Sequence, residues 1–141
     1  MEISTVRRRV QETIDRARRA AAERRQRTDD AARQYDLFLD QVAVPMFKQV
    51  ASVLKAGGYP FGVMTPGGSV RLTSEKTADD YVELSLDTAG EEPVVMGHSR
   101  HSRGRRVREI ERPIGVGPVS ALTEEQVLDF LMLELEPFVE K

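Results

Sequence analysis

The chain has 141 residues, of which 40% are hydrophobic and 31% are charged, and its formal net charge is −2. This length predicts one small domain with an extension, and the nearly balanced charge argues against nucleic-acid binding by bulk charge. The chain contains no cysteine, which excludes disulfides, thiol catalysis and cysteine-ligated metal sites.

The first residues, MEISTVRRRV, lack the apolar run that a signal peptide carries. No stretch approaches the roughly 18 consecutive apolar residues that a membrane span requires. A chain without cysteine is typical of a reducing compartment. We therefore expect a cytoplasmic protein without a membrane partner.

The first third of the chain carries a heptad pattern that predicts one long helix over residues 2–43. Its seam alternates between steps of four and three residues, which keeps one helix face toward a partner helix. The seam consists of Ile3, Arg7, Val10, Ile14, Ala17, Ala21, Arg24, Thr28, Ala31, Tyr35, Phe38 and Val42. A helix of about 40 residues is roughly 60 Å long. A domain of the remaining ~100 residues has a radius of gyration of only about 13 Å and cannot cover it.

The seam therefore folds back on itself or pairs with another chain. Residues 27–30 are the best candidate for a reversal, but they contain neither Gly nor Pro, so a continuous helix is favoured. We predict that residues 1–43 are an oligomerisation segment and that the protein is a homo-oligomer, with a dimer as the expected state. Parallel and antiparallel pairing both fit the alanine-rich seam. The expected interface residues are Ile3, Val10, Ile14, Ala17, Ala21, Tyr35 and Phe38.

Residues 45–141 are predicted to form a small domain. Pro45 indicates a kink or a new helix over 45–56, which Gly57 and Gly58 end. The apolar period then changes to two, which predicts strands near 61–65, 70–73, 81–87, 93–99 and 105–111. Their short connections require an antiparallel meander.

Thr123 and Gln126 form a capping-box pattern ahead of an amphipathic helix. The predicted fold class is thus α+β. It combines a long N-terminal helix of coiled-coil type, a five-stranded antiparallel meander, and a C-terminal amphipathic helix packed on one face of the sheet.

The segment 98–108 combines five arginines with two histidines. Guanidinium groups suit phosphates and carboxylates, so the candidate anion-binding residues are Arg100, Arg103, Arg105, Arg106 and Arg108. The alternative interpretation is a solvated hairpin whose arginines pair with glutamates across the sheet. The segment contains no Phe, Tyr or Trp for stacking on bases, so nucleic acid is not the favoured partner.

No motif in the sequence predicts catalysis, a cofactor or a metal. His98 and His101 are three residues apart on a strand or turn, with no Asp, Glu or Cys beside them. The run Gly115–Pro118 lacks the ending of a phosphate-binding loop. We therefore expect a protein that is not an enzyme and that uses no cofactor or metal.

Three functions are compatible with these observations, and the first is favoured. It is a homo-oligomeric interaction or scaffold module that assembles through its N-terminal helix and binds a protein partner. The second is a nucleic-acid or anion-binding protein that uses the basic hairpin 98–108. The third is a small-molecule binder or enzyme on the polar sheet face, which carries Arg71, Thr73, Tyr81, Glu83, Ser85 and Arg108.

Overall fold

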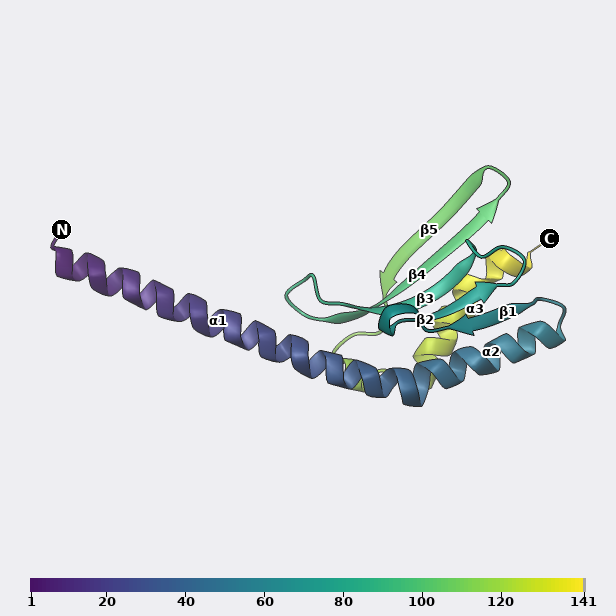
Figure 1. The fold of residues 1–141 in the computed structure, drawn as a ribbon, viewed down its shortest axis with the longest axis horizontal. Helices are drawn as coiled ribbons and strands as arrows, with labels where there is room; N and C mark the ends of the chain where they lie inside the picture. Colours follow the sequence, from purple (N-terminus) through teal and green to yellow (C-terminus); the bar gives the residue numbers. More distant parts are fainter. Residues whose placement is uncertain (141) are drawn as a thin grey trace.

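The computed structural model describes residues 1–140 and has the predicted α+β architecture (Figure 1). The helices are α1 (Ile3–Phe38), α2 (Val44–Ala56) and α3 (Glu124–Val139). The strands are β1 (Phe61–Met64), β2 (Val70–Ser74), β3 (Tyr81–Asp87), β4 (Val94–Arg103) and β5 (Arg106–Pro113). The fold class inferred from the sequence is confirmed.

A π-helical turn, Leu39–Ala43, joins α1 to α2 without an interruption of the helical backbone. The path bends at this point, as Figure 1 shows. A π-turn is a recognised cause of such a bend. Pro45 lies in the first turn of α2, a position that proline tolerates because its fixed φ suits a helix. The expected change at Pro45 is therefore a bend within one continuous helical path, and Gly58, with φ of 91°, follows its end.

The strands form one sheet in the order β1-β2-β3-β4-β5, and every neighbouring pair is antiparallel. The β4–β5 hairpin extends farther than the sequence indicates, to the closing pair Arg103 and Arg106. Gly104, at the first position of the turn, has φ of 63°, which glycine adopts without a steric penalty. Arg100 is the last β4 residue with a partner on β3. Beyond it the two strands project from the sheet as a ribbon (Figure 1).

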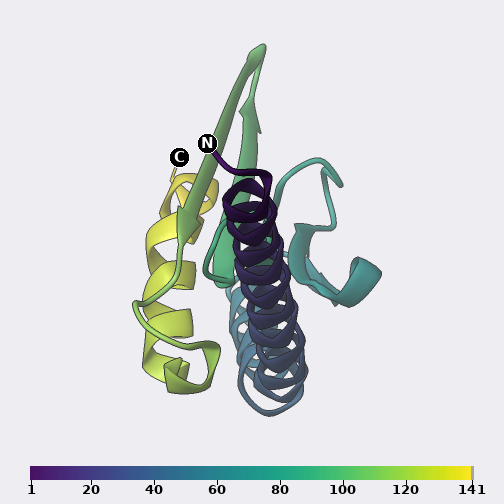
Figure 2. The same cartoon turned by 90° about the vertical axis from the view of Figure 1, so that its left-hand side faces the viewer.

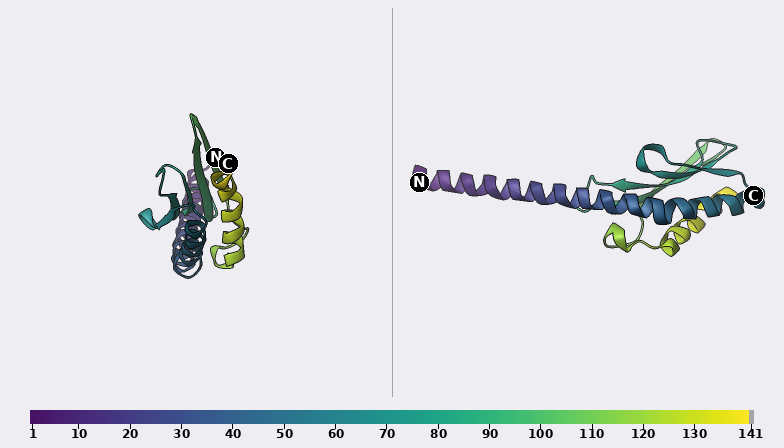
Figure 3. Two further views of the ribbon diagram at one scale, coloured as in Figure 1. Left: turned by 90° about the vertical axis from the view of Figure 1, so that its right-hand side faces the viewer. Right: turned by 60° about the horizontal axis from the view of Figure 1, so that its bottom comes forward.

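The helices cover one face of the sheet. Helix α2 contacts β1 and β2, whereas α3 contacts β3 and β4 and lies beside α2. End-on views show α3 next to the α1–α2 path and the β4–β5 ribbon rising away from both (Figures 2 and 3). The core between these layers includes the fully buried side chains of Phe47, Leu72, Leu84 and Leu131.

Polar contacts fix α3 on the sheet. The Thr123 hydroxyl accepts a hydrogen bond from the Gln126 backbone N–H at 3.2 Å, which completes the predicted capping box. Glu134 is buried on the sheet-facing side of the helix. It accepts hydrogen bonds from the Ser99 hydroxyl at 2.9 Å and from Arg112 Nε at 3.1 Å. The buried carboxylate is thus paired with a cation and a hydroxyl, as burial of a charge requires.

Tyr35 anchors the end of α1 in this core. Its hydroxyl donates a hydrogen bond to the Leu84 carbonyl oxygen at 3.2 Å. Burial raises the pKa of Tyr35 well above its usual value of 10.0, and the carboxylates of Glu83 and Asp36 add to the effect. A tyrosine of the unfolded chain ionises near pH 10, whereas the folded protein keeps the proton.

Tyr35 is therefore expected to make stability fall as the pH rises above 10, because the unfolded state then releases a proton that the folded state retains. Tyr35→Phe should lower the free energy of unfolding by about 1 kcal/mol at neutral pH and should flatten this alkaline decline. Urea unfolding across the alkaline range measures both effects, with Tyr59→Phe as the control. An equally steep decline in Tyr35→Phe would assign it to other groups.

The helical run Ile3–Ala56 has 54 residues and includes an 18-residue window with a mean hydropathy of 1.2. By length and composition this run meets the requirements of a membrane-crossing helix. A third of the window, 33%, is buried inside the domain. Core helices of soluble proteins have the same property, so the window is weak evidence for a membrane span.

Candidate interaction surfaces

The N-terminal part of α1, residues 3–27, extends away from the domain and is called the rod below (Figures 1 and 3). Along the described chain, the first buried residue of α1 is Ala31. The rod exposes large apolar side chains: Ile3 is 76% exposed, Val6 44%, Val10 53% and Ile14 38%. Of the expected interface residues, Ile3, Val10, Ile14 and Ala17 are exposed and Ala21 is half-buried. These five positions are open to a partner.

Tyr35 and Phe38 continue the same helix face but are only 4% and 5% exposed. They pack in the core of their own domain, with ring centroids 6.2 Å apart. From Ala31 onward the seam face is buried in the domain. The expected role of Tyr35 and Phe38 as oligomer contacts is therefore corrected: they are core residues.

Exposed ion pairs along α1 link its charged side chains to one another and to the domain. Arg8 Nε lies 4.0 Å from Glu12 Oε1, and Arg33 pairs with Asp30. Arg27 Nε reaches Glu92 Oε1 in the β3–β4 loop at 3.8 Å. Such exposed pairs contribute at most about 1 kcal/mol each, so the ion pairs do not by themselves hold the rod in place.

Strand alternation divides the arginines of the basic hairpin between two faces and the turn. His101 lies opposite Arg108, and Arg103 lies opposite Arg106, so these four residues share one face. Arg100 lies on the other face, where its Nε is 3.4 Å from Glu109 Oε1. Arg105 is in the turn. The five predicted anion-binding residues therefore do not converge, but Arg103, Arg106 and Arg108 do.

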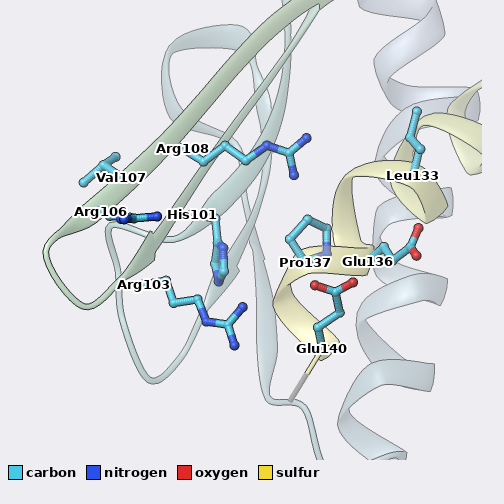
Figure 4. Close-up of a pocket in the computed structure, with 9 residues that line it drawn as sticks. All are labelled: His101, Arg103, Arg106, Val107, Arg108, Leu133, Glu136, Pro137 and Glu140. Carbon is cyan, nitrogen blue, oxygen red and sulfur yellow. The ribbon is translucent and has the colours of Figure 1, made fainter.

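The converging arginines face the end of α3 across a groove of about 540 Å³, called the tip groove below (Figure 4). Its opposite wall carries Glu136, Pro137 and Glu140. Among residues 1–140, no carboxylate lies within 4.0 Å of the three guanidinium groups. The His101 ring packs against Phe138, with centroids 4.6 Å apart. Of the cross-strand ion pairs that the arginines of a solvated hairpin would form, residues 1–140 contain only the pair between Arg100 and Glu109.

The polar face of the sheet is occupied by contacts among its own side chains. Arg71 pairs with Glu83 and lies over the Tyr81 ring, 4.0 Å from its centroid. The Tyr81 ring meets His98 edge to face at 5.4 Å, and His98 Nε2 is 4.0 Å from Glu109 Oε1. Arg108, expected on this face, is on the opposite one. Arg71 and Arg100 already have carboxylate partners on this side of the sheet, so neither guanidinium is free to receive an anionic small molecule.

Two further surfaces were not predicted from the sequence. An apolar groove of about 390 Å³ lies between α2 and α3 and is lined by Met46, Gln49, Val50, Val53, Leu54, Leu128 and Met132. A cleft of about 200 Å³ lies between α3 and the start of the loop after β5, and it shares Leu133 with the tip groove. The alternation of Arg106, Arg108 and Arg112 with Glu109 and Glu111 predicts which face of β5 is basic, whereas both surfaces depend on where α3 lies.

Within residues 1–140, no group of three or more His, Cys, Asp or Glu side chains is placed to hold a metal ion. No family model, curated protein or solved structure matches this chain.

Proposed function

We propose that this protein is a homo-oligomeric interaction module, a dimer that pairs through its rods and displays two small α+β domains to a protein partner. The observation that carries the proposal is the exposure of Ile3, Val6, Val10 and Ile14 on a helix that leaves the domain. Isolated helices gain most of their stability from packing of an apolar face. A second helix along this face would supply that packing.

A second copy of the chain fits the rod as its partner because the seam is self-complementary. In an antiparallel pair centred between Val10 and Ile14, each Val10 meets Ile14 of the second copy. The same register sets Ile3 against Ala21 and Arg7 against Ala17. This is an isologous contact, in which residue i meets residue j and residue j meets residue i.

Parallel pairing in register would instead set Arg7 against Arg7 and Arg24 against Arg24. Like charges at seam positions destabilise a coiled coil and change its register. In the antiparallel arrangement neither Arg7 nor Arg24 meets the same arginine of the second copy. This is the arrangement that we propose. Because the rod is about 37 Å long, the two domains would then lie at opposite ends of the paired rods.

Light scattering over a dilution series tests the assembly. Wild type should give twice the chain mass of 15.8 kDa, and Val10→Asp with Ile14→Asp should give the single-chain mass. Two carboxylates buried in an apolar seam lack partners and cost several kcal/mol. The domain itself should melt unchanged, because its core begins at Ala31.

A matched control places the same charges on the rod but outside the seam. Ala22 and Gln26 are exposed and neutral, and Ala22→Asp with Gln26→Asp adds two negative charges without touching the seam. This control should remain a dimer. A monomeric wild type, or equal dissociation of both double variants, would contradict the proposal.

A further inference from the structure

Strand β5 presents an open edge. It is the last strand of the sheet and pairs only with β4. The Ile114 backbone N–H donates to the Val95 carbonyl oxygen at 2.9 Å, and in an antiparallel pair the residues that bond to the neighbouring strand alternate. Arg106, Arg108, Ile110 and Arg112 therefore direct their backbone groups toward β4. Val107, Glu109 and Glu111 direct theirs outward, and all three are exposed.

The two faces of this edge strand carry opposite charges. Arg106, Arg108 and Arg112 lie on the face toward α3, whereas Glu109 and Glu111 lie on the other face. A two-fold dimer through this edge sets residues of the same face opposite each other. Every such register centred within 106–112 opposes arginine with arginine or glutamate with glutamate, which is destabilising. A second copy of the chain is thus a poor occupant.

Space for an added strand is available beside β5 on the side of α3. Helix α3 contacts β3 and β4, and the residues of β5 are exposed or half-buried. The tip groove of about 540 Å³ and the adjoining cleft of about 200 Å³ meet at Leu133 and follow β5 along the helix. Side chains of an added strand that point toward α3 would enter these grooves.

We propose that the β5 edge binds an extended, acidic segment of a partner protein by strand addition. Its backbone would pair with Val107, Glu109 and Glu111. Alternate carboxylates would face Arg106 and Arg108, and neutral side chains would face the two glutamates. Strand addition takes its affinity from backbone hydrogen bonds and its specificity from alternate side chains. The β5 edge contains no residue of the rod. An experiment can therefore contradict strand addition without contradicting the proposed dimer, and the reverse also holds.

A nucleic acid fits the surface around Arg106 and Arg108 less well than an acidic peptide segment does. Glu109 and Glu111 lie on the face of β5 opposite to the arginines. An alternating peptide sets neutral side chains against them, whereas a phosphodiester backbone carries a charge at every nucleotide and is repelled. The His101 ring already packs on Phe138, so it does not offer a free face to a base.

The test uses fluorescently labelled synthetic octapeptides and the full chain. An alternating Glu-Thr peptide should bind. A peptide with the same composition but four consecutive Glu residues followed by four Thr residues should bind at least tenfold more weakly. Arg106→Glu with Arg108→Glu should weaken binding of the alternating peptide by at least about tenfold. Circular dichroism would verify that each variant is folded.

Backbone pairing is tested separately. Glu111→Pro removes an outward N–H and no bond to β4, and it should weaken peptide binding about fivefold, the effect of one backbone hydrogen bond. Glu111→Ala, which keeps the N–H, should bind at least as well as wild type. Equal binding of the two peptides, or equal affinities of Glu111→Pro and Glu111→Ala, would overturn strand addition. Tighter binding of an oligothymidine of the same charge would assign the surface to nucleic acid, and absence of peptide binding would remove the proposal.

Discussion

Mixing the Val10→Cys and Ile14→Cys variants is expected to give mainly mixed disulfide-linked dimers under mild oxidation. In the proposed antiparallel register, Val10 of one copy meets Ile14 of the other, so a cysteine at one position faces a cysteine at the other only in the mixed pair. The chain has no native cysteine, so the introduced thiols are the only ones that can react. Isotopic labelling of one variant and mass spectrometry of the cross-linked species give the fraction of mixed dimers.

Each variant alone serves as the control. Antiparallel pairing predicts little cross-linking in either one, because the introduced thiol then faces the unchanged Ile14 or Val10 of the second copy. Parallel pairing predicts the reverse, with each variant cross-linking to itself. If only half of the cross-linked dimers are mixed, which is the fraction expected from random pairing, the antiparallel register is contradicted. The outcome also decides whether the two domains lie at opposite ends of the paired rods or side by side.

Replacing Gly97 with alanine is expected to lower the free energy of unfolding by about 3 kcal/mol, at the upper end of the range for overpacked cores. A Cβ at this position would lie 2.5 Å from Phe130 Cζ and would also clash with its Cε1. The Phe130 ring is buried, and the Arg112 guanidinium lies over it, 4.9 Å from its centroid. It cannot move away without displacing α3 from the sheet. Urea unfolding of wild type and variant measures the loss.

Gly90→Ala is the matched control, because a Cβ there meets nothing closer than 4.0 Å. It should leave the stability within about 0.5 kcal/mol of wild type. A second check combines Gly97→Ala with Phe130→Leu. Because the clash and the ring are then removed together, the double variant should lose less than the sum of the single variants. Additive losses would mean that the contact with Phe130 is not the cause.

The sequence alone determined the order and type of the elements. Heptad spacing predicted the long helix, the change of period at Tyr59 predicted the strands, and Thr123 with Gln126 predicted the start of α3. These features are local, because propensity, capping and alternation act between residues only a few positions apart. The sequence also indicated that the small domain cannot cover a helix of this length.

Tertiary structure decides at which residue the long helix passes from solvent into the core of the domain. Ala17 and Ala31 occupy equivalent seam positions, yet Ala17 is exposed and Ala31 is buried. The difference is that the domain buries α1 only from Ala31 onward, and a heptad pattern carries no information about where that burial begins. For the same reason the heptad pattern predicts Tyr35 and Phe38 at an oligomer interface, although they pack in the core of their own domain.

The division of the arginines likewise required the structure. The sequence showed a basic run, but the register of β4 against β5 placed Arg103, Arg106 and Arg108 on one face and Arg100 on the other. A change of one residue in that register would exchange the two faces. The position of α3 then left β5 with an open edge and a groove beside it. Both depend on contacts between residues far apart in the chain, and no local pattern fixes such contacts.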